Sequence, residues 1–433
     1  MKELVLLDEQ AGRLPKGEKL LYWLVLIFFV SLFIPRMPVI TNSLLGILVL
    51  LSFSSNSLKE KIGLLKTRPY ILLLISYYLL LLLSLLWSGD KAEATTQLEI
   101  RLPILLLPLA IGTMVIPPQL KDRIIFAIAI VTTVIAFISV GLSFSQYNAT
   151  GNSGYLYNDS LTVHFGLQSI YVAMLVNISI VGFIYLLTRK PSFVTMPGLL
   201  YLFLVVLFGY HFLLASRSAM ILLYGALFVY AVYYILKKRK YLEGATLLLG
   251  MCIGAFILFK FFPKTIQRFK ELTYTSYQYN SNAAESHYDM QLSSEQWNGA
   301  NTRLALWGCG WEVAKKNLFT GVGIGDRVQA VNEVYKARNF TMAIETKKNV
   351  HNSYLDALLT FGMGGLLIFL VGFAVLPLYD VIKRGSKFDL FVVTAFVVSM
   401  IFEVYLGRSI GCMLAGFFYA LLAATKKEPM ADH

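Results

Sequence analysis

Charged residues, cysteines and histidines are all scarce in this sequence of 433 residues. Only 15% of its residues are charged, and it contains three Cys and five His. Three cysteines are too few, and an odd number, for a disulfide framework, and no Cys or His pair has the spacing of a zinc site. Asp-rich loops of the kind that hold Mg²⁺ are also missing from the sequence. The sequence therefore predicts neither a catalytic metal nor another cofactor.

Hydrophobic residues, in contrast, make up 57% of the chain, and the mean hydropathy of +0.65 excludes a soluble globular domain. A membrane helix needs about 20 apolar residues, so this composition suffices for about twelve spans. We predict an all-α, polytopic membrane protein with twelve transmembrane helices. The short connectors 35–38 and 215–218 leave open that one pair is re-entrant. The apolar runs are 20–35, 38–53, 70–87, 102–116, 124–145, 165–187, 197–214, 218–236, 243–262, 354–377, 388–404 and 408–424.

The net charge of +13, from 38 Lys and Arg against 25 Asp and Glu, is distributed unevenly along the chain. The N-terminal segment, alternate connectors and the tail carry 21 of the 38 basic residues, and the opposite short connectors carry five. Because basic residues are retained on the cytoplasmic side, we expect both termini in the cytoplasm. We also expect contacts with membrane lipids and no nucleic-acid partner. The five outer residues are Arg36, Lys91, Arg101, Arg217 and Arg408.

One large polar insertion divides the chain into three parts. It covers 263–351, between the ninth and tenth runs, and the count of basic residues puts it on the outer side. The parts are then a membrane region of nine spans at 1–262, the periplasmic loop, and a membrane region of three spans at 352–433. Apolar residues at helical spacing in 263–272 and 303–316 predict a helical cap over the membrane, where we expect the function. The polar first 19 residues indicate a cytoplasmic tail before a retained span.

Two arginines lie on the predicted outer side. Arg217 stands at the outer end of two spans, in the sequence LASRSA. It is either a snorkelling anchor or an anion site, since a guanidinium offers several donors to phosphate or carboxylate. Arg303 precedes Trp307 and Trp311, which share one helix face. Arg303 either pairs with a local acid such as Glu312 or lies over the membrane mouth, facing the same anion as Arg217.

His351 stands at the junction of the outer loop and the tenth span. It begins the sequence HNSYL and is followed by the small-residue turn FGMGG. A neutral imidazole is the side chain best suited to take a proton from a hydroxyl near neutral pH. The alternative is a hydrogen-bonded interface histidine without a chemical role.

Other polar patterns on this side admit simple interpretations. The sequence GVGIG at 321–325 lacks the Lys-Ser/Thr of a phosphate-binding loop and is interpreted as a turn between cap helices. Glu403 with Arg408, and Glu99 with Arg101, are either ion pairs at the rim or parts of a site. The stronger signal is that five candidate residues all fall on the same side of the membrane. They are Arg101, Arg217, Arg303, His351 and Arg408.

Three segments, taken in order, resemble the O-antigen ligase family, which shares a domain with O-antigen polymerases and bacterial O-oligosaccharyltransferases. They cover about 205–375, with the outer loop between late spans in the expected place. The loop at 261–300 matches no family pattern, and the regular Arg-x₁₀-Gly spacing of some polymerases is missing, which favours a ligase. The segments are LASRSA at 214–219, Arg303-x₃-Trp307-x₃-Trp311 with Asn317-x₃-Gly321-x-Gly323-x-Gly325, and His351-Asn352-Ser353-Tyr354 with Gly362-x₂-Gly365.

The resemblance implies a glycosyltransferase of GT-C-like architecture in the bacterial inner membrane, acting in lipopolysaccharide biosynthesis. Such a ligase transfers a glycan from undecaprenyl diphosphate to a lipid A-core oligosaccharide at the periplasmic face. By the resemblance, Arg217 and Arg303 bind the diphosphate and His351 is the base on the acceptor hydroxyl. A single displacement without a metal predicts inversion of the anomeric centre. Further candidates for contacts with the diphosphate or sugar are Arg101, Arg408, Asn352, Tyr354, Glu403 and His164.

Other functions stay open at this point. An O-antigen polymerase or O-oligosaccharyltransferase of the same superfamily would share these residues. A transporter or flippase would share the twelve spans with both termini inside, but transporters place ionisable groups near the bilayer midplane, and the centres of these runs are nearly free of charge. A structural scaffold would leave the Arg and His positions replaceable. We expect a monomer.

Overall fold

A computed structural model describes residues 14–281, 283, 285 and 296–425, and in these residues the chain is helical with only isolated β-bridges. Six of the helices begin with proline at their first position, where a missing N–H costs nothing. The helices are α2 (Lys16–Ser31), α3 (Pro38–Ser55), α4 (Leu58–Thr67), α5 (Pro69–Ser84), α6 (Lys91–Arg101), α7 (Pro103–Ala110), η1 (Ile111–Thr113), α8 (Pro118–Thr150), η2 (Ser153–Leu156), α9 (Asn158–Thr162), η3 (Val163–Phe165), α10 (Ser169–Arg189), α11 (Pro197–Leu214), α12 (Arg217–Leu236), α13 (Tyr241–Phe261), α14 (Pro263–Lys270), η4 (Glu271–Thr273), α15 (Asn301–Lys316), α16 (Arg327–Ala337), α17 (Thr341–Glu345), α18 (Ser353–Leu370), η5 (Val371–Val375), α19 (Leu376–Arg384), α20 (Lys387–Phe402), η6 (Tyr405–Gly407) and α21 (Ser409–Ala424).

Each of the twelve predicted apolar runs contains a helix, but not all of these helices have spanning length. In the described residues, eight helical segments are long and apolar enough to cross a membrane, or nine if α4 and α5 form one bent span. The helices α2, α20 and α21 have 16 residues each. At 1.5 Å per residue this is about 24 Å, less than the ~30 Å of a hydrocarbon core. The chain is a multi-pass helical membrane protein, and the number twelve stays a prediction.

In the described residues, the bend that could make a broken or re-entrant span does not lie at either of the short connectors 35–38 and 215–218. It joins α4 and α5 at 102°, where Arg68 ends one helix and Pro69 begins the next. Proline disfavours a helical conformation in the residue before it. Arg68 has φ −125° and ψ 68°, and its side chain donates to the carbonyls of Gly112 and Met114 at 2.6 and 2.7 Å. The bend therefore follows from local sequence.

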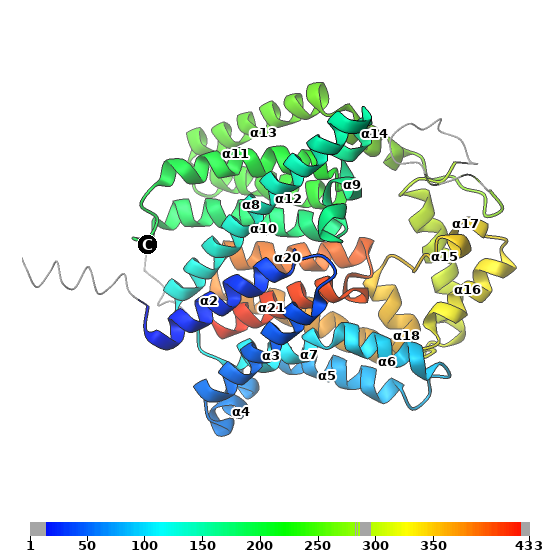
Figure 1. Ribbon diagram of the computed structural model, residues 1–433. Coiled ribbons are helices and arrows are strands. Elements are labelled where there is room, and N and C mark those ends of the chain that lie inside the picture. The colour runs from blue at the N-terminus through cyan, green and yellow to red at the C-terminus, as the bar shows by residue number, and fades with distance from the viewer. Residues whose placement is uncertain (1–13, 282, 284, 286–295, 426–433) are drawn as a thin grey trace, which may run out of the picture.

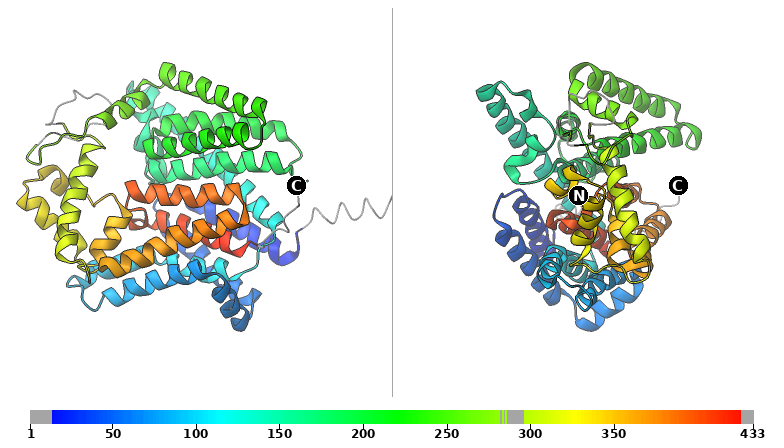
Figure 2. Two further views of the ribbon diagram at one scale, coloured as in Figure 1. Left: turned by 180° about the vertical axis from the view of Figure 1, so that it is seen from behind. Right: turned by 90° about the vertical axis from the view of Figure 1, so that its right-hand side faces the viewer.

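Burial separates central helices from peripheral ones. In α21 every residue from Gly411 to Ala424 is buried, whereas in α13 only Gly244 is buried. The layer α10–α13 lies on one side of α20 and α21, and α3 with α5–α7 lies on the other (Figures 1 and 2). A helix that is apolar on all sides but exposed, such as α13, suits contact with lipid. The start of α2 and the end of α21 lie at one end of the bundle, and α15–α17 at the other (Figure 1).

The segment after α13 forms the helices α14–α17, which we call the cap. The turn between α15 and α16 holds the sequence GVGIG, as predicted, and it packs onto a break in α18. There Gly362 has φ +69°, Val322 N–H donates to the Leu359 carbonyl at 2.8 Å, and Gly323 N–H donates to the Thr360 carbonyl at 3.0 Å. A Cβ on Gly321 would come within 2.3 Å of Thr360. The break in α18 is therefore completed by main-chain bonds from the cap.

Candidate functional site

His351 occupies a fixed turn immediately before α18. Its backbone has φ +44°, a left-handed conformation that is uncommon outside glycine. Its N–H donates to Asn349 Oδ1 at 2.8 Å, and Trp307 Nε1 donates to its carbonyl at 3.4 Å. Asn352 Oδ1 accepts from the first free N–H groups of α18, those of Tyr354 and Leu355. The helix cap and the turn together determine where the imidazole points.

The His351 ring is paired with Glu403, which follows the end of α20. Nδ1 lies 2.8 Å from Glu403 Oε2, and the His351 side chain is 22% exposed. Ser353 Oγ donates to the Glu403 carbonyl at 2.7 Å and accepts from Tyr405 N–H at 2.8 Å, which fixes the backbone around the carboxylate. A carboxylate at Nδ1 favours the tautomer with the proton on Nδ1. Nε2, which has no partner in the described part of the chain, then carries the lone pair.

Arg303 on α15 contacts the residue next to Glu403. Its Nε donates to the Phe402 carbonyl at 3.0 Å, and Nη1 donates to the Gly299 carbonyl at 2.5 Å. Burial lowers the pKa of Arg303, and the Glu403 carboxylate opposes that effect. Glu312 pairs instead with Arg338 at 3.0 Å and Lys316 at 3.8 Å, so the local ion pair considered from sequence does not form.

Arg217 begins α12, and its guanidinium group lies near that of Arg303. Its Nη1 donates to the Arg268 carbonyl at 2.8 Å and to Glu271 Oε2 at 3.1 Å, and its side chain is 9% exposed. Gly299 lies between the two guanidinium groups: a Cβ there would be 2.0 Å from Arg217 Nη2 and 3.2 Å from Arg303 Nη1. The structure therefore brings Arg217, Arg303 and the His351–Glu403 pair into one group.

Two further residues of this group are missed by sequence reasoning. Arg268 on α14 has buried Nε and Nη1 atoms without a hydrogen-bond partner in the described residues, and its charge acts on both Arg217 and Arg303. Burial raises the pKa of Glu271, while Arg217 and Arg268 oppose the rise. The sequence predicts the helix 263–272, but no spacing in it links Arg268 or Glu271 to residues 50 or more positions away.

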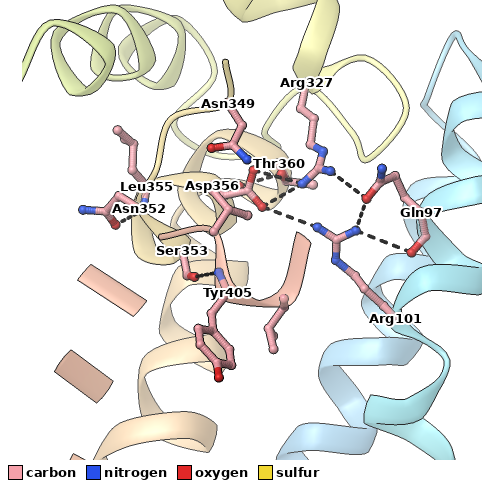
Figure 3. A network of polar contacts seen from close by, with 12 residues as sticks. Gln97, Arg101, Arg327, Asn349, Asn352, Ser353, Leu355, Asp356, Thr360 and Tyr405 are labelled. Carbon is pink, nitrogen blue, oxygen red and sulfur yellow. Dashed lines mark hydrogen bonds and ion pairs between the residues drawn. The ribbon is translucent and has the colours of Figure 1, made fainter. Parts of the chain in front are cut away.

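Arg101 belongs to a different cluster. Figure 3 shows Arg101 from α6 and Arg327 from α16 converging on Asp356 of α18. Arg327 Nη1 lies 2.9 and 2.8 Å from the two Asp356 oxygens, Arg101 Nη2 lies 3.6 Å from Oδ2, and both arginines bond Gln97. The side chains are 1%, 9% and 10% exposed for Arg101, Arg327 and Asp356. This cluster joins the cap to α6 and α18. Of the two alternatives left open for Arg101, the ion pair with Glu99 does not form in the described residues.

In the described residues, no hydrogen bond or ion pair links Arg408, Tyr354 or His164 to Arg217, Arg303 or His351. Arg408 is exposed at the start of α21, and Glu403 pairs with His351 in its place. Tyr354 Oη donates to the Val397 carbonyl at 2.9 Å inside the bundle. His164 lies in η3, where its buried Nε2 has no hydrogen-bond partner in the described residues. In the same residues, no three His, Cys, Asp or Glu side chains are grouped so that they could hold a metal. Catalysis without a metal stays a prediction.

The long apolar helices define a multi-pass membrane protein with a polar site at one end of its bundle. Residues 202–370 match the model of the O-antigen ligase family, the family that the sequence resemblance predicted. The family is glycosyltransferase-like and belongs with O-antigen polymerases and O-oligosaccharyltransferases. No curated protein matches the chain. The matched region contains Arg217, Arg303 and His351, and it ends before Glu403.

Proposed function

We propose that the protein is an O-antigen ligase. It transfers a glycan from undecaprenyl diphosphate to a lipid A-core oligosaccharide at the periplasmic face of the bacterial inner membrane. The observation that carries the proposal is the meeting of Arg217 and Arg303 at Gly299, beside the His351–Glu403 pair. The excess of basic residues in the connectors on the opposite side supports this orientation.

The charges of the site suit a diphosphate leaving group. Cleavage of the anomeric bond leaves negative charge on the diphosphate, and fixed guanidinium groups in a site away from bulk water stabilise that charge. Arg303 is held by main-chain carbonyls, which do not neutralise it, and Arg217 is held by one carbonyl and the Glu271 carboxylate. Arg268 adds a third positive charge against the carboxylates of Glu271 and Glu403. The three arginines exceed the two carboxylates by one positive charge, which favours an anionic ligand.

His351 supplies the base in this proposal. With Glu403 holding Nδ1, the Nε2 lone pair takes the proton from the acceptor hydroxyl as its oxygen attacks the anomeric carbon. The sugar–phosphate bond breaks as the new glycosidic bond forms, and the electron pair leaves with the diphosphate. Attack opposite the leaving group inverts the anomeric configuration, which NMR of the product measures.

The test uses purified protein in lipid bilayers, supplied with lipid-linked glycan with and without lipid A-core. A lipopolysaccharide ladder that needs lipid A-core supports a ligase. Longer lipid-linked chains without lipid A-core would identify a polymerase, and glycan crossing the bilayer without transfer would identify a flippase. Arg303→Ala and His351→Ala should abolish the ladder. Arg338→Ala, which removes an exposed arginine of the same cap, should retain it.

A further inference from the structure

A large cavity lies at the end of the bundle opposite His351. It has a volume of about 880 Å³ and is bounded by α8, α10, α12, α19 and α20. Arg217 begins α12, and Tyr234, which lines the cavity, stands near its other end, about 25 Å away at 1.5 Å per residue. Likewise, α20 begins at the cavity with Lys387 and ends at Phe402 beside the candidate site. The cavity and the site therefore face opposite membrane surfaces.

The wall of this cavity is amphipathic. Val181, Ile184, Leu227 and Phe391 give it an apolar side along the helices. Basic side chains outnumber acidic ones in the lining, with Lys121, Arg189, Lys383, Arg384 and Lys387 against Asp389 alone. An apolar groove with a basic end matches acyl chains joined to an anionic headgroup.

Ion pairing leaves two of these cations uncompensated. Lys121 lies 2.5 Å from Asp389, Arg189 lies 3.3 Å from Asp122, and Arg384 lies 2.5 Å from Asp380. Lys383 and Lys387, in contrast, form no ion pair within the described part of the chain. Their ammonium groups therefore supply the net positive charge at the mouth of the cavity.

Aromatic rings position Lys387 without neutralising it. Its Nζ lies 4.6, 5.0 and 5.2 Å from the ring centroids of Tyr230, Tyr233 and Tyr234. The hydroxyls of Tyr230 and Tyr234 are 3.0 Å apart, and both residues line the cavity. Cation–π contacts use the ring quadrupole and carry no charge of their own. Lys387 is thereby held at the cavity with its charge intact.

We propose that this cavity binds an anionic phospholipid of the leaflet opposite the candidate site. Its phosphate contacts Lys383 and Lys387, and an acyl chain lies along the apolar wall. A free phosphate would use the same two cations but would leave the apolar wall empty, so the wall favours the lipid. The inference goes beyond glycan transfer and does not depend on it.

Native mass spectrometry of the delipidated full-length protein tests the proposal. The protein is titrated with phosphatidylglycerol, with phosphatidylcholine of the same acyl chains, and with inorganic phosphate. We expect a clear preference for phosphatidylglycerol that millimolar phosphate does not displace. Lys383→Gln with Lys387→Gln should weaken phosphatidylglycerol binding about 25-fold, at roughly fivefold per lost cation. Lys387→Arg should retain it.

The matched control is Lys237→Gln with Lys238→Gln, which removes the same charge from the same end of α12 outside the cavity. It should keep the preference. Equal binding of the two lipids, displacement by phosphate, or an equal loss in the control would each overturn the proposal. If the double variant does not fold, as judged by gel filtration and thermal unfolding in detergent, Lys387→Gln alone should still lower binding about fivefold.

Discussion

Two pairs of arginines, three of them buried and Arg303 half-buried, have different surroundings in this protein. Arg101 and Arg327 share the carboxylate of Asp356 and the side chain of Gln97, and no imidazole lies among these partners. Arg217 and Arg303 meet at Gly299, next to an imidazole with one open nitrogen. Arg303 donates to two main-chain carbonyls, and Arg217 donates to one carbonyl and to the Glu271 carboxylate. The first arrangement closes both guanidinium groups on one side-chain anion, whereas the second pairs only Arg217 with a carboxylate and leaves Arg303 on main-chain carbonyls. The acceptors around an arginine therefore separate a structural cluster from a candidate site.

Among variants that test this difference between the two pairs, the one that removes the imidazole should have the largest effect on activity. His351→Ala should lower the rate of glycan transfer by about 10²–10⁴-fold, since it removes the proposed general base. Single-turnover assays with lipid-linked glycan and lipid A-core measure this loss. Membrane level and thermal unfolding should stay near those of the unchanged protein. A variant that keeps full activity would show that Arg217 and Arg303 work without this base.

Asp356→Asn should have a large effect of a different kind. It leaves Arg101 and Arg327 buried without a carboxylate, which costs about 3–5 kcal/mol of unfolding free energy. Thermal unfolding in detergent measures the change. The Asp380→Asn control, at a pair whose carboxylate is 34% exposed, should cost about 1 kcal/mol or less. If Asp356→Asn removes activity while leaving stability unchanged, the cluster belongs to the site.

Gly299→Ala tests the meeting point of the site arginines directly. The added methyl would lie 2.0 Å from Arg217 Nη2, so this guanidinium must move. A displacement of about 1 Å in a catalytic group can cost 10²-fold in rate, and we expect a loss of roughly that size. Gly308→Ala on α15, where the nearest atom is a tyrosine hydroxyl at 3.2 Å, is the matched control and should stay active.

The smallest expected effect belongs to Arg268→Gln. Its guanidinium adds a third positive charge but does not bridge Arg217 and Arg303, so we expect about tenfold weaker binding of the lipid-linked donor. This corresponds to roughly 1.4 kcal/mol, the scale of one hydrogen bond to a charged group. The expected signature is a higher KM for the donor with little change in kcat. An unchanged KM would remove Arg268 from the diphosphate site.

The parts of the fold and site that depend on local sequence could be predicted. The apolar runs predict where the membrane helices lie. Arg217, Arg303 and His351 can be picked out because each lies in a distinct motif at a helix end. Partnerships depend on distant residues and cannot be predicted from local sequence: the sequence leaves open whether Glu403 pairs with Arg408 or belongs to the site, and in the structure it pairs with His351. Arg101 lies on the expected side, yet Asp356 and Gln97 bind it. Arg268 and Glu271 had no local signal, because they gain meaning only when α14 packs beside Arg217.

The break in α18 has a consequence for the independence of the cap. At Gly362 the helix gives up internal bonds, and the carbonyls of Leu359 and Thr360 are bonded by Val322 and Gly323 of the cap. Leu359 and Thr360 are almost fully buried, so lifting the cap would leave their carbonyls unpaired in apolar surroundings. These main-chain bonds therefore tie the turn between α15 and α16 to α18, and lifting the cap would break them. In the proposed function, substrates then reach His351 with the cap in place.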